Sequence, residues 1–250
     1  MRNDKKVFTN FKVHTQYSIC EGAIKIHDLA NYCKENKVPS IGISDTLNMC
    51  GVLEFSEAIS KAGTQPLIGT QINFKYLDVY GKIPIFAKSE LGYNNLVKLS
   101  SKSFLENNQL ESPNCTINDL FENCKDLIVL SGGIDSLFSK LVNKNKIDSL
   151  NKLSKSIKDI FGNSFYLEIQ RHNDKGEKNL ENVYLDLSEK NKIPIIASQE
   201  IFYINQDMYE AHDALLCIGE KTYVDELNRK KYSDQHYIKP QDEISKIYED

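Results

Sequence analysis

The fold is decided by a short unit at residues 26–43, which reads IHDLANYCKENKVPSIGI. The apolar residues Ile26, Leu29, Ala30 and Cys33 have the i, i+3, i+4, i+7 spacing of one face of a helix. The run Ser40–Ile43 that follows is short and rich in isoleucine, as buried strands are. This unit therefore predicts a helix that leads directly into a buried strand.

The same alternation extends outward in both directions. Further short apolar runs lie at Val7–Val13, Pro66–Phe74, Ile83–Ala87, Asp126–Leu130, Ser164–Ile169 and Ile193–Ala197. Helical faces lie between several of them. About seven strand–helix units predict parallel strands buried on both sides, and this much repetition favours a closed barrel over an open sheet. No GxGxxG or GxxxxGK[ST] follows any run, so the fingerprint of a nucleotide-binding Rossmann or P-loop fold is missing.

Length and composition limit the alternatives. The chain has 250 residues, with 31 Lys+Arg against 35 Asp+Glu, and a formal net charge of −4. This size is ordinary for one α/β barrel, so a single domain over residues 1–250 is expected. No apolar run approaches the roughly 18 residues of a membrane span, and the N-terminus lacks a signal core, which predicts a cytoplasmic protein. The acidic balance does not favour direct binding of nucleic acid.

Two polar segments interrupt the pattern. Residues 106–116 are predicted to form a loop, and residues 221–240 are mixed and end at Pro240 before a short helix-like tail. The tail reaches Asp250 without a helix stop signal, so the chain is expected to be a piece of a longer protein. The six cysteines form no CxxC pair and are predicted to be reduced.

Polar residues gather where the predicted strands end. In a β/α barrel, functional groups lie at the C-terminal ends of the strands, so these residues are the candidates for a site. They are Lys12, His14, Glu21, Asp45, Thr46, Gln71, Gly133, Glu168, His172, Glu200 and Phe202.

One string among them is specific. VHTQYS at residues 13–18, with EGA at 21–23, resembles the opening motif of PHP domains (polymerase and histidinol phosphatase). The version that it most resembles is the one at the N-terminus of bacterial DNA polymerase III alpha subunits. The resemblance continues in order through ISDTLNMCG at 43–51, QPLIG at 65–69, GYNNL at 92–96, LSGG at 130–133, FYLEIQRH at 165–172 and EAHD at 210–213. It implies an α/β fold, the distorted seven-stranded (β/α)7 PHP barrel.

The resemblance also implies which residues would hold metal. Active PHP domains bind a cluster of metal ions through His and carboxylate ligands and hydrolyse phosphoesters. Where the family has ligands, this chain has Lys12, Thr46, Gln71, Gly133 and Phe202, and a further family histidine falls near Lys82. Lysine offers only donors and phenylalanine offers no lone pair. The chain is therefore predicted to be a degenerate PHP domain without catalytic residues and without a metal cofactor.

Three residues of the implied ligand set remain, namely His14, Glu21 and Glu200. If any ion binds, zinc or manganese held by these three is the alternative. The corresponding alternative function is an active PHP metallo-phosphoesterase or 3′–5′ exonuclease. A free-standing histidinol-phosphatase relative is a third possibility, which the strings at 65–69 and 92–96 disfavour because they look like the polymerase branch.

Charge compensation is expected at the vestigial site. Loss of metal would leave Glu21, Asp45, Glu168 and Glu200 uncompensated, and Lys12 and Lys82 could pair with them. A simpler interpretation of His14 is that it only faces the core. A simpler interpretation of Asp45 is that it only braces a turn. We expect His236 to be incidental, His212 to pack or cap, and His172 either to brace a loop or to serve the site.

The resemblance finally implies a role. The parent would perform template-directed DNA synthesis in later domains, so polymerase catalysis is not expected of these residues. The expected role is structural, with docking of a proofreading exonuclease subunit. Expected partners are that subunit and the remaining domains of the polymerase chain, with DNA contacted only through the parent and no membrane. Residues 221–250 would begin the connection to the next domain.

Overall fold

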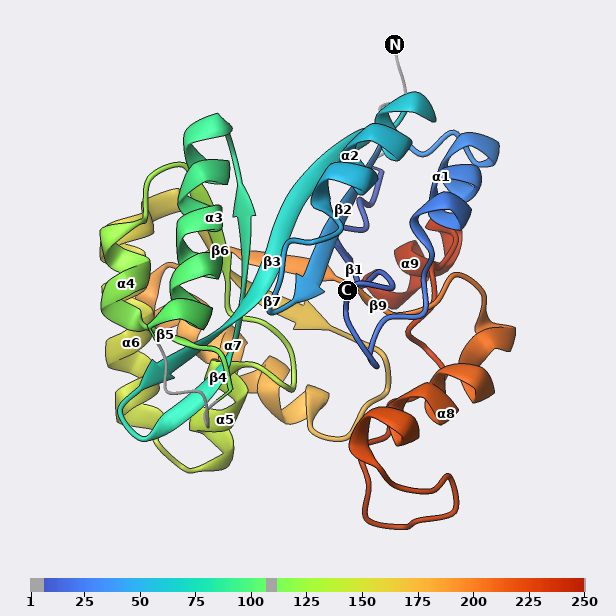
Figure 1. Cartoon of the computed structure of the whole chain (residues 1–250). Coiled ribbons are helices and arrows are strands. Elements are labelled where there is room, and N and C mark those ends of the chain that lie inside the picture. The colour runs from blue at the N-terminus through green and yellow to red at the C-terminus, as the bar shows by residue number, and fades with distance from the viewer. Residues whose placement is uncertain (1–6, 107–111, 250) are drawn as a thin grey trace.

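The computed structural model describes residues 7–106 and 112–249, and its strands curve into a nearly closed barrel (Figure 1). The sheet has the order β8-β7-β6-β4-β3-β2-β1-β9, and β5 lies off this path against β3. The strands are β1 (Lys12–Val13), β2 (Ser40–Thr46), β3 (Gln65–Tyr76), β4 (Val79–Ala87), β5 (Cys115–Thr116), β6 (Leu127–Leu130), β7 (Phe165–Gln170), β8 (Ile195–Ser198) and β9 (Glu200–Ile201).

The chain itself joins the two ends of this sheet. β8 pairs with β7, and β9 pairs with β1, yet only Gln199 separates β8 from β9 in the sequence. One extended segment therefore spans the place where the barrel would otherwise be open. If β8 and β9 are counted as one strand, the barrel has the seven strands that the sequence predicts.

One strand runs against the expected direction. β4 is antiparallel to both β3 and β6, whereas the remaining pairs of the sheet are parallel. The expectation of parallel strands throughout was wrong here, because only Leu77 and Asp78 connect β3 to β4. Two residues can close a hairpin but cannot make the crossover that parallel neighbours require. Leu77 adopts a left-handed conformation, with a φ of 56°, at this turn.

Helices surround the barrel and bury their apolar faces against it. They are α1 (Ile26–Glu35), α2 (Val52–Lys61), α3 (Glu90–Leu105), α4 (Ile117–Glu122), α5 (Leu137–Asn143), α6 (Ile147–Phe161), α7 (Glu177–Asn191), α8 (Tyr209–Glu220) and α9 (Gln241–Ile247), with 3-10 turns at Gly162–Ser164 and Gln206–Met208. As predicted, Ile26, Leu29 and Cys33 are the buried face of α1. Figure 1 shows α3 to α6 on one flank of the barrel and α1 and α2 on the other.

The core is divided in the same way. The larger apolar cluster joins β3, β4, β6 and β7 to helices α3 to α7, and a smaller one joins β1 and β2 to α1 and α2. Burial of such clusters supplies the main driving force for folding. No helix in the described part of the chain has the length and apolar character needed to span a membrane.

The polar segments differ from expectation in part. Of the predicted loop at 106–116, residues 107–111 lie outside the described residues, and Cys115–Thr116 form β5. Of the first predicted run, Val7–Val13, only Lys12–Val13 are strand. Residues 221–240 contain neither helix nor regular strand and connect α8 to α9. We call residues 221–240 the strap.

Candidate functional site

The predicted site residues do come together, at the end of the barrel where the parallel strands finish. We call this set the rim cluster: Lys12, His14, Glu21, Asp45, Thr46, Gln71, Glu168, Glu200 and Phe202. Because β1, β2, β3, β7 and β9 are neighbours or near neighbours in the barrel, their polar ends converge. Most of these side chains are buried, although nearly all are polar or charged.

Lys12 lies at the centre of the rim cluster. Its Nζ is 2.9 Å from Oε1 of Glu168 and 3.5 Å from Oε2 of Glu200, and its side chain is 1% exposed. Burial alone raises the pKa of Glu200, but Lys12 and His14 outweigh this effect and hold the pKa of that carboxyl well below its usual range. The predicted ion pairs of Lys12 are therefore present.

Glu200 also contacts the side chains of His14 and Gln71. Its Oε1 lies 3.0 Å from Nε2 of His14 and accepts a hydrogen bond of 2.6 Å from Nε2 of Gln71. The other ring nitrogen of His14 lies 3.1 Å from Oγ of Ser18. Both nitrogens of His14 thus face partners within the protein. The resemblance implies a glutamate at position 71, and here the neutral Gln71 amide donates a hydrogen bond to a carboxylate instead of adding a further negative charge.

Glu21 has a second set of cations. Nζ of Lys82 lies 3.0 Å from its Oε1, Nζ of Lys230 lies 3.5 Å away, and the hydroxyl of Thr46 donates to Oε2. Burial would raise the pKa of Glu21, yet the two lysines and His14 lower it strongly. Reciprocally, Glu21 raises the pKa of Lys82 although burial opposes this. The pairing expected for Lys82 is therefore observed.

Asp45 braces a turn, which is the simpler of the two roles considered for it. Its carboxylate accepts hydrogen bonds from the Thr15 amide at 2.6 Å, the Thr15 hydroxyl at 2.7 Å and the Ser18 hydroxyl at 2.7 Å. These bonds hold the loop that carries His14 and Glu21. Burial nevertheless raises the pKa of Asp45. A carboxylate occupied in this way braces the loop.

Gly133 offers no side chain, and the amide of Gln170 fills the space beside it. A Cβ on this residue would lie 2.0 Å from Oε1 of Gln170, so the Gln170 amide occupies the space that a side chain would need. Gln170 in turn donates a hydrogen bond of 2.7 Å to Oε1 of Glu168. The hydroxyl of Ser198 also donates to this oxygen. Sequence reasoning did not identify Gln170 as a site residue, whereas Ser198 directly follows the last predicted strand and was expected at this rim.

Phe202 packs its ring against histidine and tyrosine rings. Ring centroids lie 4.6 Å from His14, 5.3 Å from His212 and 4.9 Å from Tyr232. His212 is buried and its Nε2 donates to the carbonyl oxygen of Glu21 at 2.8 Å, so the packing role expected for it is confirmed. Burial lowers the pKa of His212 to about 4. This part of the rim is an aromatic stack.

Two further histidines hold the backbone of Glu200. The Glu200 amide donates to Nε2 of His172 at 3.0 Å, and Nδ1 of His236 donates to the Glu200 carbonyl at 2.8 Å. The two rings stack with centroids 4.1 Å apart. The expectation that His236 is incidental was wrong, because folding of the strap brings it to the rim. Nothing in its local sequence signals this contact.

His172, Asp174 and His236 are close enough together to be considered as metal ligands. Each ring nitrogen, however, already has a partner. Nδ1 of His172 lies 2.7 Å from Oε1 of Glu177, and Nε2 of His236 lies 2.8 Å from Oδ2 of Asp174. A metal ion would have to displace these bonds. Burial holds the pKa of His172 well below its usual range, so this ring is neutral.

Residues 230–236 of the strap contact the rim cluster and add side chains that the sequence did not indicate. Lys230 pairs with Glu21 and with Asp135, at 3.1 Å, and the hydroxyl of Tyr232 donates to Asp135 at 2.7 Å. Arg229 forms two bonds of 2.6 and 2.7 Å with Asp213 of α8. Asp135 follows the fifth predicted strand and could have been identified from that position. Lys230 and Tyr232 could not, because the strap has no periodic pattern.

Comparison with known proteins agrees with this architecture. Residues 10–172 match the model of the family described as PHP domain. The chain is 32% identical over 244 residues to the DNA polymerase III subunit alpha of Rickettsia conorii, covering 97% of this chain and 21% of that protein. It is 32% identical over 255 residues to the corresponding subunit of Borreliella burgdorferi, covering 97% and 22%. The chain thus spans about a fifth of the length of these relatives.

Solved structures share the fold. A protein of Bifidobacterium adolescentis described as a metal-dependent phosphoesterase superposes with a TM-score of 0.51, at 14% identity, over 77% of this chain and 86% of that one. The family match covers more than half of the chain, and the barrel has the expected seven strands when β8 and β9 are counted as one. The chain therefore belongs to the PHP domain family, in the form that bacterial DNA polymerase III alpha subunits carry.

Proposed function

We propose that this chain is a metal-free PHP domain of a replicative polymerase alpha subunit, in which lysine side chains replace the metal cations. The observation that carries the proposal is the position of Lys12, whose ammonium group lies between Glu168 and Glu200. Lys82 has the same relation to Glu21. A metal ion bound at these carboxylates would lie next to the positively charged ammonium groups of the lysines. The lysine side chains would first have to move away.

The other groups of the rim cluster support the same conclusion. The Thr46 hydroxyl and the Gln71 amide each donate a hydrogen bond to a carboxylate and bring no negative charge that would hold a cation. Phe202 has no lone pair to offer. The residues present therefore fit a network of ion pairs and not a cluster of metal ions, and no hydrolytic step is assigned to them.

The proposed role is structural. A parent chain of this family would synthesise DNA on a template in its other domains, and this domain would pack beside them in the cytoplasm. Residues 221–250 would begin the connection to the next domain. A proofreading exonuclease subunit is the proposed partner, and DNA would be contacted through the parent alone. Binding of that subunit can be measured by titration, and no measurable binding would contradict the docking role.

The metal content of the protein tests the central proposal. The chain is purified without chelator or added metal, and its zinc and manganese are counted by mass spectrometry. We expect far less than one ion per chain. Near-stoichiometric metal, together with nuclease activity that a chelator abolishes, would favour the alternative of an active PHP metallo-phosphoesterase or 3′–5′ exonuclease.

A further inference from the structure

A cavity of about 340 Å³ lies between α5 and the N-terminal end of α7. Its wall consists of side chains of α5 and of the turn between β6 and α5, together with Lys175, Gly176 and the first turns of α7. None of the rim cluster lines this cavity. Its volume is at the lower end of the range of small-molecule sites, which is roughly 300–1,000 Å³.

One buried side chain in this wall has no partner. Ser139 of α5 is 4% exposed, and no hydrogen bond joins its hydroxyl to any residue that the structure describes. Its backbone amide is held by Oγ of Ser136 at 3.1 Å. The protein encloses several other unpaired polar atoms completely but leaves Oγ of Ser139 accessible, and Ser139 borders the cavity. A buried hydroxyl without a partner is costly unless a ligand or water satisfies it.

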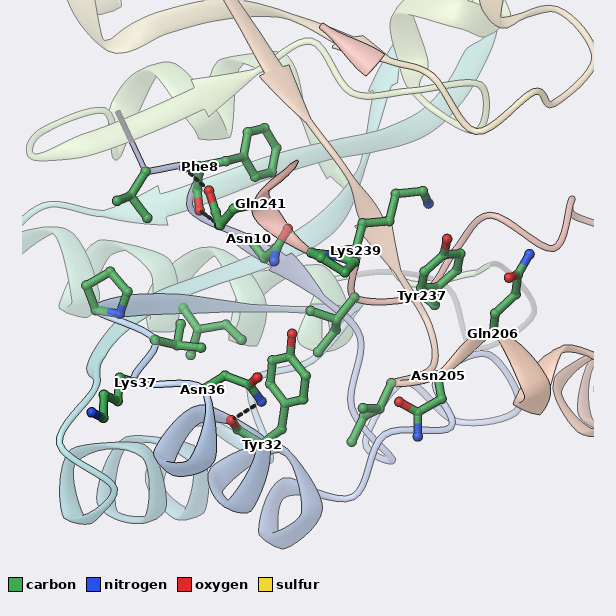
Figure 2. A pocket seen from close by; sticks show the side chains of 17 residues that line it. Phe8, Asn10, Tyr32, Asn36, Lys37, Asn205, Gln206, Tyr237, Lys239 and Gln241 are labelled. Carbon is green, nitrogen blue, oxygen red and sulfur yellow. Dashed lines mark hydrogen bonds between the residues drawn. The ribbon is translucent and has the colours of Figure 1, made fainter. Parts of the chain in front are cut away.

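Accessibility of such a group distinguishes this cavity from a larger one of about 600 Å³ between α1 and residues 237–241 (Figure 2). In the larger cavity the unpaired Oδ1 of Asn10 is completely enclosed, and the Lys239 ammonium donates to the carbonyl of Gln235. Neither of these buried groups is open to a ligand. Volume alone therefore does not define a site.

The N-terminal end of α7 supplies free donors close to Ser139. This helix has 15 residues, and no side chain caps its first turn. The backbone amides of Lys178 and Asn179 have no acceptor among the described residues. Aligned peptide dipoles give such a helix end a partial positive charge, which favours an anion. Because Gly176 and Asn179 both border the cavity, this end of α7 faces it.

The charged groups around the cavity also favour an anion. Lys175 borders it, is exposed, and forms no ion pair with any residue in the described part of the chain. Asp135 borders it as well, but its carboxylate is already bonded to Lys230 at 3.1 Å and to Tyr232 at 2.7 Å. Glu177 is not part of the wall, and its carboxylate accepts from backbone amides of the preceding loop.

We propose that this cavity binds a phosphate group, carried by inorganic phosphate or by a small phosphate monoester. The Ser139 hydroxyl and the free amides at the start of α7 donate to the phosphate oxygens, and Lys175 supplies positive charge. Such charge-assisted hydrogen bonds are roughly twice as strong as those between neutral groups. Apolar side chains such as Leu180 offer a wall for the organic part of a monoester. The proposal does not depend on the metal-free state of the rim cluster.

Calorimetric titration of the 250-residue chain, at constant ionic strength set with sodium chloride, tests the proposal. Inorganic phosphate is expected to bind with a Kd of the order of 1 mM. Glycerol 3-phosphate should bind about threefold more tightly if a monoester is the ligand, because the apolar wall then contacts its carbon atoms. Equal affinity of the two probes would assign the site to free phosphate. No binding of either probe at about ten times that concentration would overturn the proposal.

Nuclear magnetic resonance locates the bound phosphate. The amide signals of Lys178 and Asn179 should shift on saturation with inorganic phosphate. The internal control is the start of α6, a helix of the same length whose first turn also has no side-chain cap. The amide signals of Asp148 and Ser149 in that turn should stay unchanged. Equal shifts at the two helix ends would show an unspecific effect of anions and would refute the site.

Variants test the role of each group. Ser139→Ala removes a hydroxyl that has no described partner, and alanine suits a helix, so the protein should fold. It should weaken phosphate binding about tenfold. Ser44→Ala is the matched control, because it removes another unpaired buried hydroxyl outside the cavity and should leave the affinity unchanged. Unchanged phosphate affinity in a folded Ser139→Ala protein would contradict the assignment.

The contribution of positive charge is tested in the same way. Lys175→Gln should weaken phosphate binding about threefold and make it less dependent on salt concentration. Lys152→Gln, which replaces an exposed lysine of α6, is the control and should change neither quantity. Equal effects of the two substitutions would mean that only the overall charge of the protein matters, and the proposed site would then be wrong.

Discussion

The ammonium nitrogen of Lys12 lies 2.9 Å from Oε1 of Glu168, and the two side chains are 1% and 0% exposed. A pair this deeply buried is costly to break from one side, because the remaining charge has neither water nor partner. In this barrel the lysine serves two carboxylates at once, since Glu200 lies 3.5 Å away on its other side. The centre of the rim cluster is therefore a buried network in which two carboxylates share one ammonium group.

Removing Lys12 should destabilise the protein strongly. Lys12→Ala leaves Glu168 and Glu200 without their common cation, and a loss of about 3–5 kcal/mol in the free energy of unfolding is expected. Lys98→Ala, an exposed lysine on α3, is the control and should change it by less than about 0.5 kcal/mol. Urea denaturation followed by circular dichroism measures both. Equal small effects of the two substitutions would contradict the ion-pair role.

Acid should destabilise the protein through His212. Burial lowers its pKa in the folded state to about 4, whereas the unfolded chain has the ordinary value near 6.5. Between these values only the unfolded state binds the proton, so stability is complete above pH 6.5 and decreases as pH falls toward 4. The expected contribution is about 1 kcal/mol per pH unit.

Comparison of variants isolates this contribution. His212→Gln can keep the donor to the Glu21 carbonyl without titrating, so its unfolding free energy should depend less steeply on pH than that of the native chain. His27→Gln replaces a histidine whose side chain is 82% exposed and should leave the slope unchanged. If His212→Gln kept the full native slope, the buried neutral state of His212 would be refuted.

A side chain at position 133 should disturb the network around Glu168. The Cβ of Gly133→Ala would lie 2.0 Å from Oε1 of Gln170 and must displace an amide that donates to Glu168. The expected loss of stability is about 1–3 kcal/mol. In a protein that already carries Gln170→Ala, the same substitution should cost little, because the space is free. A thermal-unfolding double-mutant cycle measures the coupling, and additive losses would argue against the contact.

The strap should loosen when its anchor is removed. Arg229 holds Asp213 through two parallel bonds, and Arg229→Gln breaks this geometry close to Lys230 and Tyr232. Amide hydrogen exchange over residues 230–238 should accelerate by about tenfold, while exchange in β3 stays unchanged. Lys231→Gln is the control, because Lys231 is 53% exposed and lies 4.0 Å from Asp213. Equal exchange in both variants would show that Arg229 does not anchor the strap.

Much of the barrel could be predicted from local sequence. Helix and strand periods are readable because each element buries one side against the sheet, and the unit at 26–43 folds as expected. The direction of β4 could not be predicted from its apolar residues, since a buried parallel strand and a buried antiparallel strand can have the same run of apolar residues. Only the two-residue connection at Leu77 and Asp78 decides it.

The rim cluster was predictable for a related reason. Strand order and the rule that sites lie at strand ends place Lys12, Glu168 and Glu200 on one rim, whichever residues occupy those positions. Ion pairs among them are expected, because a buried charge needs a partner of opposite sign. Gln170 was missed because the direction of a strand residue's side chain is known only once the register of the sheet is known.

What the sequence by itself determined is therefore the set of elements, the barrel class and the group of side chains at the rim. Only the tertiary structure decided that residues 230–236 contact that rim, and that His172 and His236 hold the backbone of Glu200. The physical reason is that these contacts join segments far apart in the chain through polar groups. Such groups have no periodicity, so their partners are set by the packing of the whole molecule.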